Sequence, residues 1–197
     1  MNLDPFPGSH AGSKPVAVIV DADETVIDNS AYEAFLIGND FGYSSKTWTP
    51  WMVVARATPI PGTLAFLNYA KAKNVEIFYV TNWKMVGYEG TEKNLRALGF
   101  PYVDKKHLLL RTKPSDKQPR RDMVAKDYEI AFLMEDNLNA FLSVFHKKLI
   151  ADRFAEVDKI KEIWGKRFIV LPNPTYGDWE VPYIKATGAP VLQKKTR

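Results

Sequence analysis

The stretch Val16-Ala-Val-Ile-Val20-Asp21 decides the fold class of this chain. Its apolar residues run without interruption from Pro15 to Asp21, and most of them are β-branched. Such a run is typical of a strand that is buried on both faces in a parallel sheet. Similar runs predict further strands at residues 75–80, 129–134 and 167–171, with a short extra strand at 108–110.

Helical patterns lie between these runs. The sequence predicts helices near residues 61–73, 91–98, 117–126, 138–145 and 152–164. Gly99 follows the second of these segments, and glycine commonly ends helices. Strands that alternate with helices predict an α/β fold, Rossmann-like, with a parallel sheet flanked by helices and right-handed crossovers.

Residues 30–58 interrupt this alternation. The segment is rich in aromatic side chains, namely Tyr32, Phe35, Phe41, Tyr43, Trp48 and Trp51. It lies between the first strand and the next helix, so we expect a small helical cap insert over the edge of the sheet. We expect this insert to take part in selecting the substrate.

Length and composition fit one compact domain. Of the 197 residues, 46% are hydrophobic and 25% are charged, which is enough apolar material for a packed core. The net charge of +4 is mild and suits an anionic small substrate as well as it suits nucleic acid. The chain has no cysteine, so disulfides, thiolate zinc sites and cysteine nucleophiles are excluded.

The domain organisation follows from the same reading. We expect a flexible leader at residues 1–14, one domain at 15–185 and a basic tail at 186–197. No apolar stretch approaches the roughly 20 residues needed to cross a bilayer, and no signal peptide opens the chain. The sequence leaves homo-oligomer formation open.

Polar residues follow the predicted strands at the point where each one ends. They are Asp21 and Asp23 after the first strand, Thr81 and Asn82 after the second, Lys117 at a helix start, and Asp136 after the third. In parallel α/β sheets, ligands bind outside the carboxyl ends of the strands. We therefore expect these side chains to converge on one edge of the sheet.

Phosphoryl transfer requires this set of groups. Carboxylates hold Mg²⁺ through hard oxygen ligands, and a lysine offsets charge on the phosphoryl oxygens. One carboxylate can attack phosphorus and form an aspartyl-phosphate. A second carboxylate can protonate the leaving group and then activate water.

At these residues the sequence resembles the haloacid dehalogenase superfamily, and within it the class C acid phosphatases of lipoprotein type, which include 5′-nucleotidases. The motifs in chain order are Asp21-Ala-Asp23-Glu-Thr25, the pair Trp48 and Trp51, Tyr79-Val-Thr81-Asn82, Lys117, Asp136-Asn-Leu138 and Leu171-Pro-Asn-Pro-Thr-Tyr176. The similarity extends from about residue 16 to residue 180. Several motifs in the family's order make a chance match improbable.

The resemblance implies a haloacid dehalogenase fold and the catalytic roles. Asp21 would be the nucleophile and a metal ligand. Asp23 would be the acid/base and would lend its main-chain carbonyl to the metal. Asp136 would be a third protein ligand, and the cofactor would be Mg²⁺.

The resemblance also implies how a substrate is held. Thr81 with its neighbour Asn82, and Lys117, would bind the phosphate. Trp48 and Tyr176 match aromatic residues that enclose a nucleobase or nicotinamide ring. The chain would then be a Mg²⁺-dependent acid phosphatase acting on a small phosphomonoester, such as a nucleoside 5′-monophosphate or nicotinamide mononucleotide. Relatives of this kind are exported to the periplasm or the cell surface.

Two positions depart from the family pattern. The fourth motif usually reads Gly-Asp-Asn-Leu-x-Asp, whereas this chain has Glu135 in place of the glycine and Ala140 in place of the second aspartate. Glu135 is a candidate to compensate for the missing carboxylate. In the second motif, Trp83 replaces the usual basic residue.

These departures motivate an alternative function, a catalytically weakened protein that binds a phosphate ligand on the same scaffold. A third hypothesis, a nucleic-acid-binding module, rests only on the basic balance and the aromatic residues, and no nucleic-acid motif supports it. The Gly-x-Ser-x-Gly elbow, the dinucleotide loop and the Walker loop are all absent from the sequence.

Several of these residues also have ordinary structural interpretations. Tryptophans such as Trp48, Trp51 and Trp179 usually serve packing. A basic cluster usually forms a solvated face and can also steer phosphates into a site, and this one consists of Lys105, Lys106, Arg111, Lys113, Lys117, Arg120 and Arg121. The histidines His10, His107 and His146 show no metal-ligand spacing and are expected to be structural or surface residues.

Overall fold

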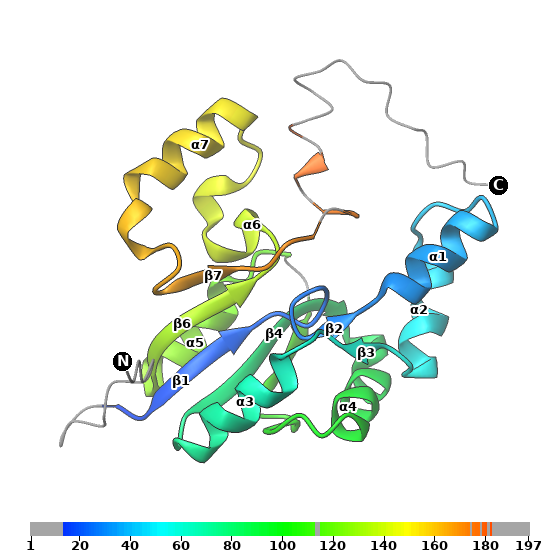
Figure 1. The fold of residues 1–197 in the computed structure, drawn as a ribbon, viewed down its shortest axis with the longest axis horizontal. Coiled ribbons are helices and arrows are strands. Elements are labelled where there is room, and N and C mark those ends of the chain that lie inside the picture. Colours follow the sequence, from blue (N-terminus) through cyan, green and yellow to red (C-terminus); the bar gives the residue numbers. More distant parts are fainter. Residues whose placement is uncertain (1–13, 113–114, 174, 178, 181, 183–197) are drawn as a thin grey trace.

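The computed structural model describes residues 14–112, 115–173, 175–177, 179–180 and 182. The predicted basic tail 186–197 lies outside these residues, and so does all of the predicted leader except Lys14. Within the described part, a five-stranded sheet carries helices on both faces (Figure 1).

The sheet is parallel throughout. Its strands are β1 (Val16–Val20), β4 (Glu76–Lys84), β5 (Leu108–Arg111), β6 (Glu129–Glu135) and β7 (Phe168–Val170), in the order β5-β4-β1-β6-β7. Every neighbouring pair is parallel, and β1 lies at the centre between β4 and β6. The expected α/β fold with a parallel sheet is therefore confirmed.

The helices occupy the connections between the strands. They are α1 (Ser30–Gly38), α2 (Ser45–Val54), α3 (Thr63–Ala72), α4 (Tyr88–Ala97), α5 (Gln118–Asp127), α6 (Leu138–Phe141) and α7 (Ile150–Lys159). The expected helix near 138–145 is shorter than predicted, because α6 gives way to a 3-10 turn at Ser143–Phe145. The expected strand at 75–80 is longer than predicted and extends to Lys84.

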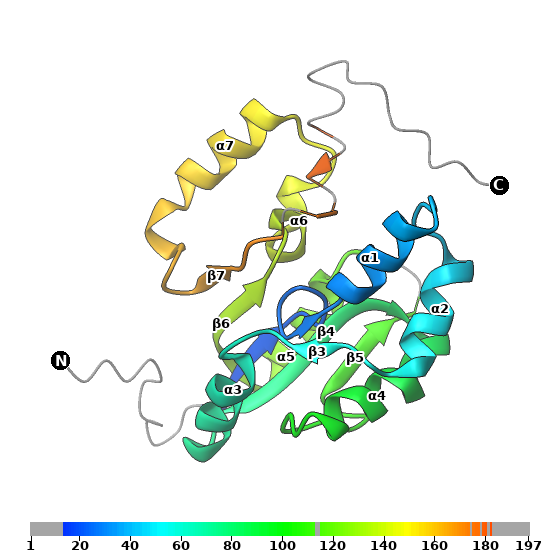
Figure 2. The same ribbon diagram turned by 45° about the vertical axis from the view of Figure 1, so that its right-hand side comes forward.

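Strand β1 is buried along its whole length because it contributes to two cores. Val16, Val18 and Val20 pack in the larger core, which includes Leu67 of α3. The alternate residues Ala17 and Ile19 pack on the other face, in a smaller core that includes Val124 of α5. Because successive side chains of a strand point to opposite faces, α3 and α5 cover opposite sides of the sheet (Figures 1 and 2).

The aromatic segment 30–58 forms the insert that the sequence predicts. Its helices α1 and α2 lie beside each other, away from α7 (Figure 1). A two-stranded antiparallel ladder of β2 (Ile27–Asp28) and β3 (Thr58–Pro59) closes the base of the insert. The short ladder brings the two ends of the insert together beside the first motif.

The insert is held against the core domain where α2 meets α4. A Cβ built on Gly90 of α4 would lie 2.3 Å from the carbonyl oxygen of Met52 in α2. Only glycine permits this approach of the two backbones, since a methyl group there would push the helices apart.

We expect Gly90→Ala to lower the free energy of unfolding by about 1–3 kcal/mol, because overpacking forces backbone shifts. Thermal or urea unfolding would measure the change. Gly38→Ala in α1 is the matched control, because nothing lies within 4 Å of a Cβ at that position. An alanine there should be neutral or stabilising, and equal losses in the two variants would contradict the packing argument.

Among the described residues, no helix combines the length and the apolar character needed to cross a bilayer.

Candidate active site

Asp21 occupies the position directly after the central strand. Its N–H donates to the carbonyl of Met134 at 3.0 Å, which continues the pairing of β1 with β6 past the end of the strand. One carboxylate oxygen, Oδ1, accepts from the N–H of Ala22 at 2.7 Å. The backbone and one side-chain oxygen of Asp21 are therefore fixed by main-chain bonds.

Lys117 lies between two carboxylates. Its Nζ is 2.7 Å from Oδ2 of Asp21 and 2.6 Å from Oε2 of Glu135. The side chains of Lys117 and Glu135 are 2% and 0% exposed. Burial alone would lower the pKa of Lys117, but the charges of Asp21 and Glu135 outweigh it and raise the pKa. Lys117 therefore stays charged.

Glu135 is a buried group that the family pattern does not contain. Its second oxygen, Oε1, is buried and has no hydrogen-bond partner. Burial raises the pKa of Glu135 well above its usual range, and Lys117 opposes that rise. The only contact shown for this carboxyl group is its ion pair with Lys117, so Glu135 helps to hold Lys117 in place.

Asp23 is held at both carboxylate oxygens. The amide of Asn29 donates to Oδ1 at 2.8 Å, and the indole N–H of Trp83 donates to Oδ2. Burial raises the pKa of Asp23 well above its usual range, and the nearby charges of Asp21 and Glu24 raise it further. An aspartic acid in this setting keeps a proton at a higher pH than an exposed one.

Glu24 links the first motif to the C-terminal motif. It has a positive φ of 47°, and its side chain accepts from the N–H of Asn29 at 2.9 Å. The hydroxyl of Tyr176 donates to the other carboxylate oxygen of Glu24. Burial raises the pKa of Glu24, and the hydrogen bonds from Tyr176 and Asn29 oppose that rise.

Asp136 directly follows β6, which flanks β1 on the side opposite to β4. The side-chain amide of Asn173 donates to its Oδ2 at 2.7 Å. Burial, followed by the charge of Asp21, raises the pKa of Asp136 to about 6.

Thr81 and Asn82 lie within β4 and are braced by Arg120. The Arg120 guanidinium donates to the Thr81 carbonyl and, at 2.7 Å, to Oδ1 of Asn82. The buried hydroxyl of Thr81 accepts from the N–H of Trp83 at 3.2 Å. Arg120 and Arg121 thus bond to other groups of the protein, and Lys117 is buried, which corrects the expectation of a solvated face for these three residues. Lys105 and Lys106 of the same cluster are exposed, as expected.

These groups surround a cavity of about 160 Å³. Its lining contains Asp21, Asp23, Asn82, Ser115, Lys117, Asp136, Asn137, Asn139, Ala140, His146, Tyr176 and Gly177. The structure therefore brings together all the site residues that the sequence proposes except Thr81 and Trp48, which do not line this cavity. Parallel pairing explains the convergence, since the carboxyl ends of β1, β4 and β6 meet at one edge.

Trp48 lies inside the insert and is 8% exposed. Its ring meets Tyr32 edge-on at a centroid distance of 4.8 Å, and it meets Trp83 edge-on at 5.5 Å. In this arrangement Trp48 acts as a packing residue between the insert and β4. Its stacking on a substrate stays a prediction.

Sequence reasoning did not identify several residues of the cavity wall. His146 lines the cavity, with its Nε2 3.1 Å from the carbonyl of Asn139, whereas the sequence suggested only a structural or surface role. No motif or spacing could have signalled it, because its position depends on how the chain turns after α6. His107 has the structural role expected of it, with its ring nitrogens each 2.7 Å from a carboxylate oxygen, one of Asp104 and one of Glu76.

The residues fit a hard divalent cation by the chemistry of their donors. Within the described residues, no three side chains of His, Cys, Asp or Glu are arranged to hold a metal ion on their own. Asp21 and Asp136 nevertheless supply carboxylate oxygens at the cavity, and the main-chain carbonyl of Asp23 is an oxygen donor of the same kind. The pKa of Asp136 is raised in part by the charge of Asp21, so added positive charge between these two acids would be favourable.

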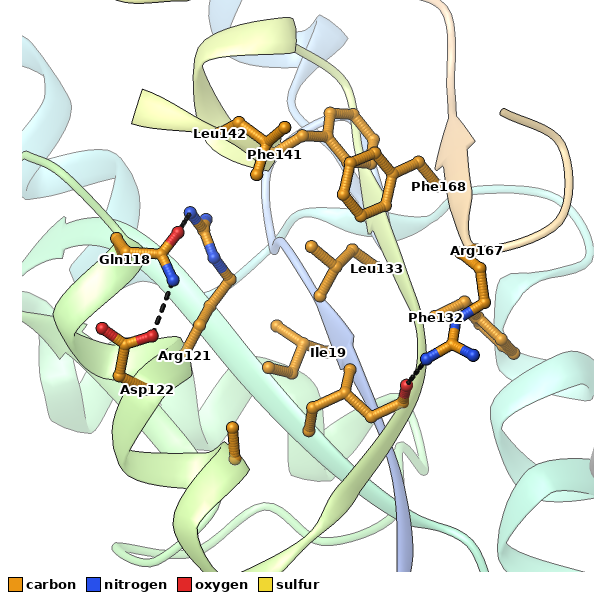
Figure 3. Close-up of a pocket in the computed structure, with 12 residues that line it drawn as sticks. Ile19, Gln118, Arg121, Asp122, Phe132, Leu133, Phe141, Leu142, Arg167 and Phe168 are labelled. Atoms are coloured by element: carbon orange, nitrogen blue, oxygen red, sulfur yellow. Dashed lines mark hydrogen bonds between the residues drawn. The ribbon is translucent and has the colours of Figure 1, made fainter. Parts of the chain in front are cut away.

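A second cavity, of about 210 Å³, lies on the α5 face of the sheet (Figure 3). Its walls are mostly apolar and include Ile19, Leu133, Phe141 and Phe168. The polar groups at its edge bond to one another or to the main chain, as Arg121 does with Gln118 at 2.7 Å and Arg167 does with the Ile130 carbonyl at 2.8 Å. This cavity lacks the converging acids and lysine of the first one.

Comparison with known proteins places the chain among phosphatases. A family model described as HAD superfamily, subfamily IIIB (acid phosphatase), matches residues 7–179. The class C acid phosphatase from Bacillus anthracis with tungstate bound is 37% identical with a TM-score of 0.81, over 87% of this chain and 73% of that chain. Another structure of a class C acid phosphatase from Bacillus anthracis is 36% identical with a TM-score of 0.82, over 89% of this chain and 74% of that one.

A more distant match shows the fold alone. A chain in the Pnkp1/Rnl/Hen1 complex is 15% identical with a TM-score of 0.55, over 90% of this chain and 51% of that one. The resemblance drawn from the sequence motifs is confirmed by the family match and by the two Bacillus anthracis structures.

Proposed function

Because the chain belongs to the haloacid dehalogenase superfamily, subfamily IIIB, and is an acid phosphatase of that family, we propose that it hydrolyses small phosphomonoesters through an aspartyl-phosphate on Asp21. The observation that carries this proposal is that Asp21, Asp23, Asp136 and Lys117 line the same cavity. It combines a nucleophile, an acid/base, a further acidic oxygen donor and a fixed cation.

The first step forms a bond between a carboxylate oxygen of Asp21 and phosphorus, and it breaks the ester P–O bond. Asp23 gives its proton to the departing oxygen. The raised pKa of Asp23 supports this role, because burial keeps the carboxyl protonated at a higher pH than an exposed aspartate.

The second step releases phosphate. Asp23, now ionised, takes a proton from water, the water oxygen bonds to phosphorus, and the bond from phosphorus to Asp21 breaks. The enzyme returns to its starting state with Asp23 protonated and Asp21 ionised.

The phosphoryl group would be held by Lys117 and by residues of β4. Lys117 lies against Asp21, so its charge is next to the position where phosphorus would be attacked. Asn82 lines the cavity, and Thr81 precedes it in β4. Asp21, Asp136 and the carbonyl of Asp23 would hold Mg²⁺, which when bound supplies positive charge next to the phosphoryl oxygens.

The proposed substrates are nucleoside 5′-monophosphates or nicotinamide mononucleotide. A cavity of about 160 Å³ is small for a whole nucleotide, so it suits the phosphoryl group and leaves the rest of the substrate at its mouth. Tyr176 lines this cavity and can present an aromatic face to a base. Stacking by Trp48 would require its ring to become exposed.

The alternative, a catalytically weakened protein that binds a phosphate ligand, rests on the two departures from the family pattern, and both of these residues have partners inside the site. Ala140 removes a carboxylate expected near the metal, whereas Glu135, the candidate to compensate for it, is paired with Lys117. Trp83, which replaces a basic residue, donates a hydrogen bond to Asp23. Both substitutions are therefore integrated into the site.

The location of the protein belongs to the same proposal. The resemblance supports export to the periplasm or the cell surface, where extracellular phosphomonoesters are available. Fractionation of the native host cells would test this, and recovery of the protein with cytosolic markers would contradict it.

Phosphate release from nucleoside monophosphates, nicotinamide mononucleotide and p-nitrophenyl phosphate tests the proposed function. We expect turnover with Mg²⁺ and a loss of about 100-fold or more after treatment with a chelator, because Lys117 is then the only lysine or arginine among the described residues of the cavity lining to offset phosphate charge. Restoring Mg²⁺ should restore the rate. Equal rates with and without chelator would contradict the role of the metal.

A further inference from the structure

We propose that the aromatic residues of the insert position the carboxyl group of Asp23, through Trp83 on one oxygen and Asn29 on the other. Trp83, Trp51 and Asn29 would then be positioning residues for the acid/base. This inference rests on the proposed function of Asp23.

The first connection runs through Trp83. Its indole N–H donates to Oδ2 of Asp23, and its ring is 4% exposed. The ring meets Trp48 at an interplanar angle of 89°, and Trp48 meets Tyr32 at 79°. The packed rings of the insert therefore determine where the Trp83 N–H points.

The second connection runs through Asn29. Its side-chain amide donates to Oδ1 of Asp23 at 2.8 Å, and its own carbonyl oxygen accepts from the indole N–H of Trp51 at 2.9 Å. Asn29 is fully buried. The bond from Trp51 also determines which end of the amide faces Asp23, because the oxygen is already engaged.

The two connections act on different oxygens of Asp23, and both lead back to α2. One donor comes from β4 and the other precedes α1, and each is backed by a tryptophan of α2. Two donors on two oxygens leave the carboxyl group one orientation, and catalytic groups need this precision. The side chain of Asp23 would turn more freely if either donor were lost.

The inference predicts a defect that depends on the leaving group. Departure of a weakly acidic phenol needs the proton of Asp23, whereas departure of p-nitrophenol needs it far less. The ratio of the kcat/KM values for phenyl phosphate and p-nitrophenyl phosphate therefore reports on the positioning of Asp23. The value of kcat/KM covers events up to cleavage of the ester, so the later hydrolysis of the intermediate does not affect it.

Trp83→Phe is the decisive variant. Phenylalanine keeps a ring against Trp48 and removes the N–H donor. We expect kcat/KM for phenyl phosphate to fall about tenfold, with the value for p-nitrophenyl phosphate within about threefold of the unmodified enzyme. Trp51→Phe, which removes the donor to Asn29, should shift the ratio in the same direction by a smaller factor.

Trp164→Phe is the matched control. The indole N–H of Trp164 donates to the carbonyl of Val157 at 3.2 Å, and this residue does not line the active-site cavity. Its loss should leave the ratio of the two kcat/KM values unchanged. Thermal unfolding of every variant shows whether the protein remains folded.

The outcomes separate this inference from the proposed function. Suppose that Trp83→Phe lowers kcat/KM equally for both substrates, or for neither, while Asp21→Asn is inactive. The positioning role is then wrong and the proposed function stands. If Asp21→Asn keeps full activity, the proposed function itself is wrong. A selective loss on phenyl phosphate in the Trp83 variant supports the inference.

Discussion

Asp21→Asn is expected to abolish turnover, with a loss of at least about 10⁴-fold, and to leave the fold intact. The amide of asparagine cannot form the aspartyl-phosphate intermediate, and removal of a covalent nucleophile lowers rates by this order. The expected rate is measured as phosphate release at saturating substrate. Labelled phosphate should be trapped on the unmodified protein and not on the variant. This result would place the covalent intermediate on Asp21.

Asp40→Asn is the matched control for that change. Asp40 is exposed at the end of the first helix of the insert and has a φ of 52°, a conformation that asparagine tolerates well. It should retain the activity of the unmodified enzyme. Full activity in the Asp21 variant would rule out the assigned nucleophile.

Lys117→Met is expected to cost about 3 kcal/mol in the free energy of unfolding and to eliminate activity. The change leaves Glu135 buried with neither oxygen paired, and breaking a buried ion pair on one side is strongly destabilising. It also removes the fixed positive charge beside Asp21. Urea unfolding and phosphate release measure the two effects.

A second substitution separates stability from catalysis. The double variant Lys117→Met with Glu135→Met replaces the ion pair with an apolar pair of similar length, so most of the lost stability should return. Activity should stay absent, because the charge beside Asp21 is still missing. Recovery of activity in the double variant would contradict a role for Lys117 in holding phosphate.

The fold could be predicted from the sequence because the patterns that indicate each strand are short stretches of neighbouring residues. Each buried strand is a short apolar run, and each run ends at a polar residue. The ends of the elements were predicted less well. Strand β4 extends to Lys84 because Lys84 pairs with Arg111 of β5, and α6 is short because Leu142 adopts an extended backbone conformation.

Most residues of the candidate site could be predicted from the sequence for a related reason. Asp21, Asp136 and Lys117 follow strands or begin a helix, and parallel pairing gathers those positions at one edge. Their catalytic roles came from the family motifs, and they remain predictions for the experiments above.

The sequence by itself therefore determined the parallel α/β sheet, the aromatic insert and the acids at the strand ends, since each depends on residues that are close in the chain. Only the tertiary structure decided what those residues contact. The bond from Lys117 to Glu135 joins residues 18 apart, and the bond from Trp83 to Asp23 joins residues 60 apart. Such contacts depend on strand register and on how the insert returns to the sheet, and no local pattern records either of them.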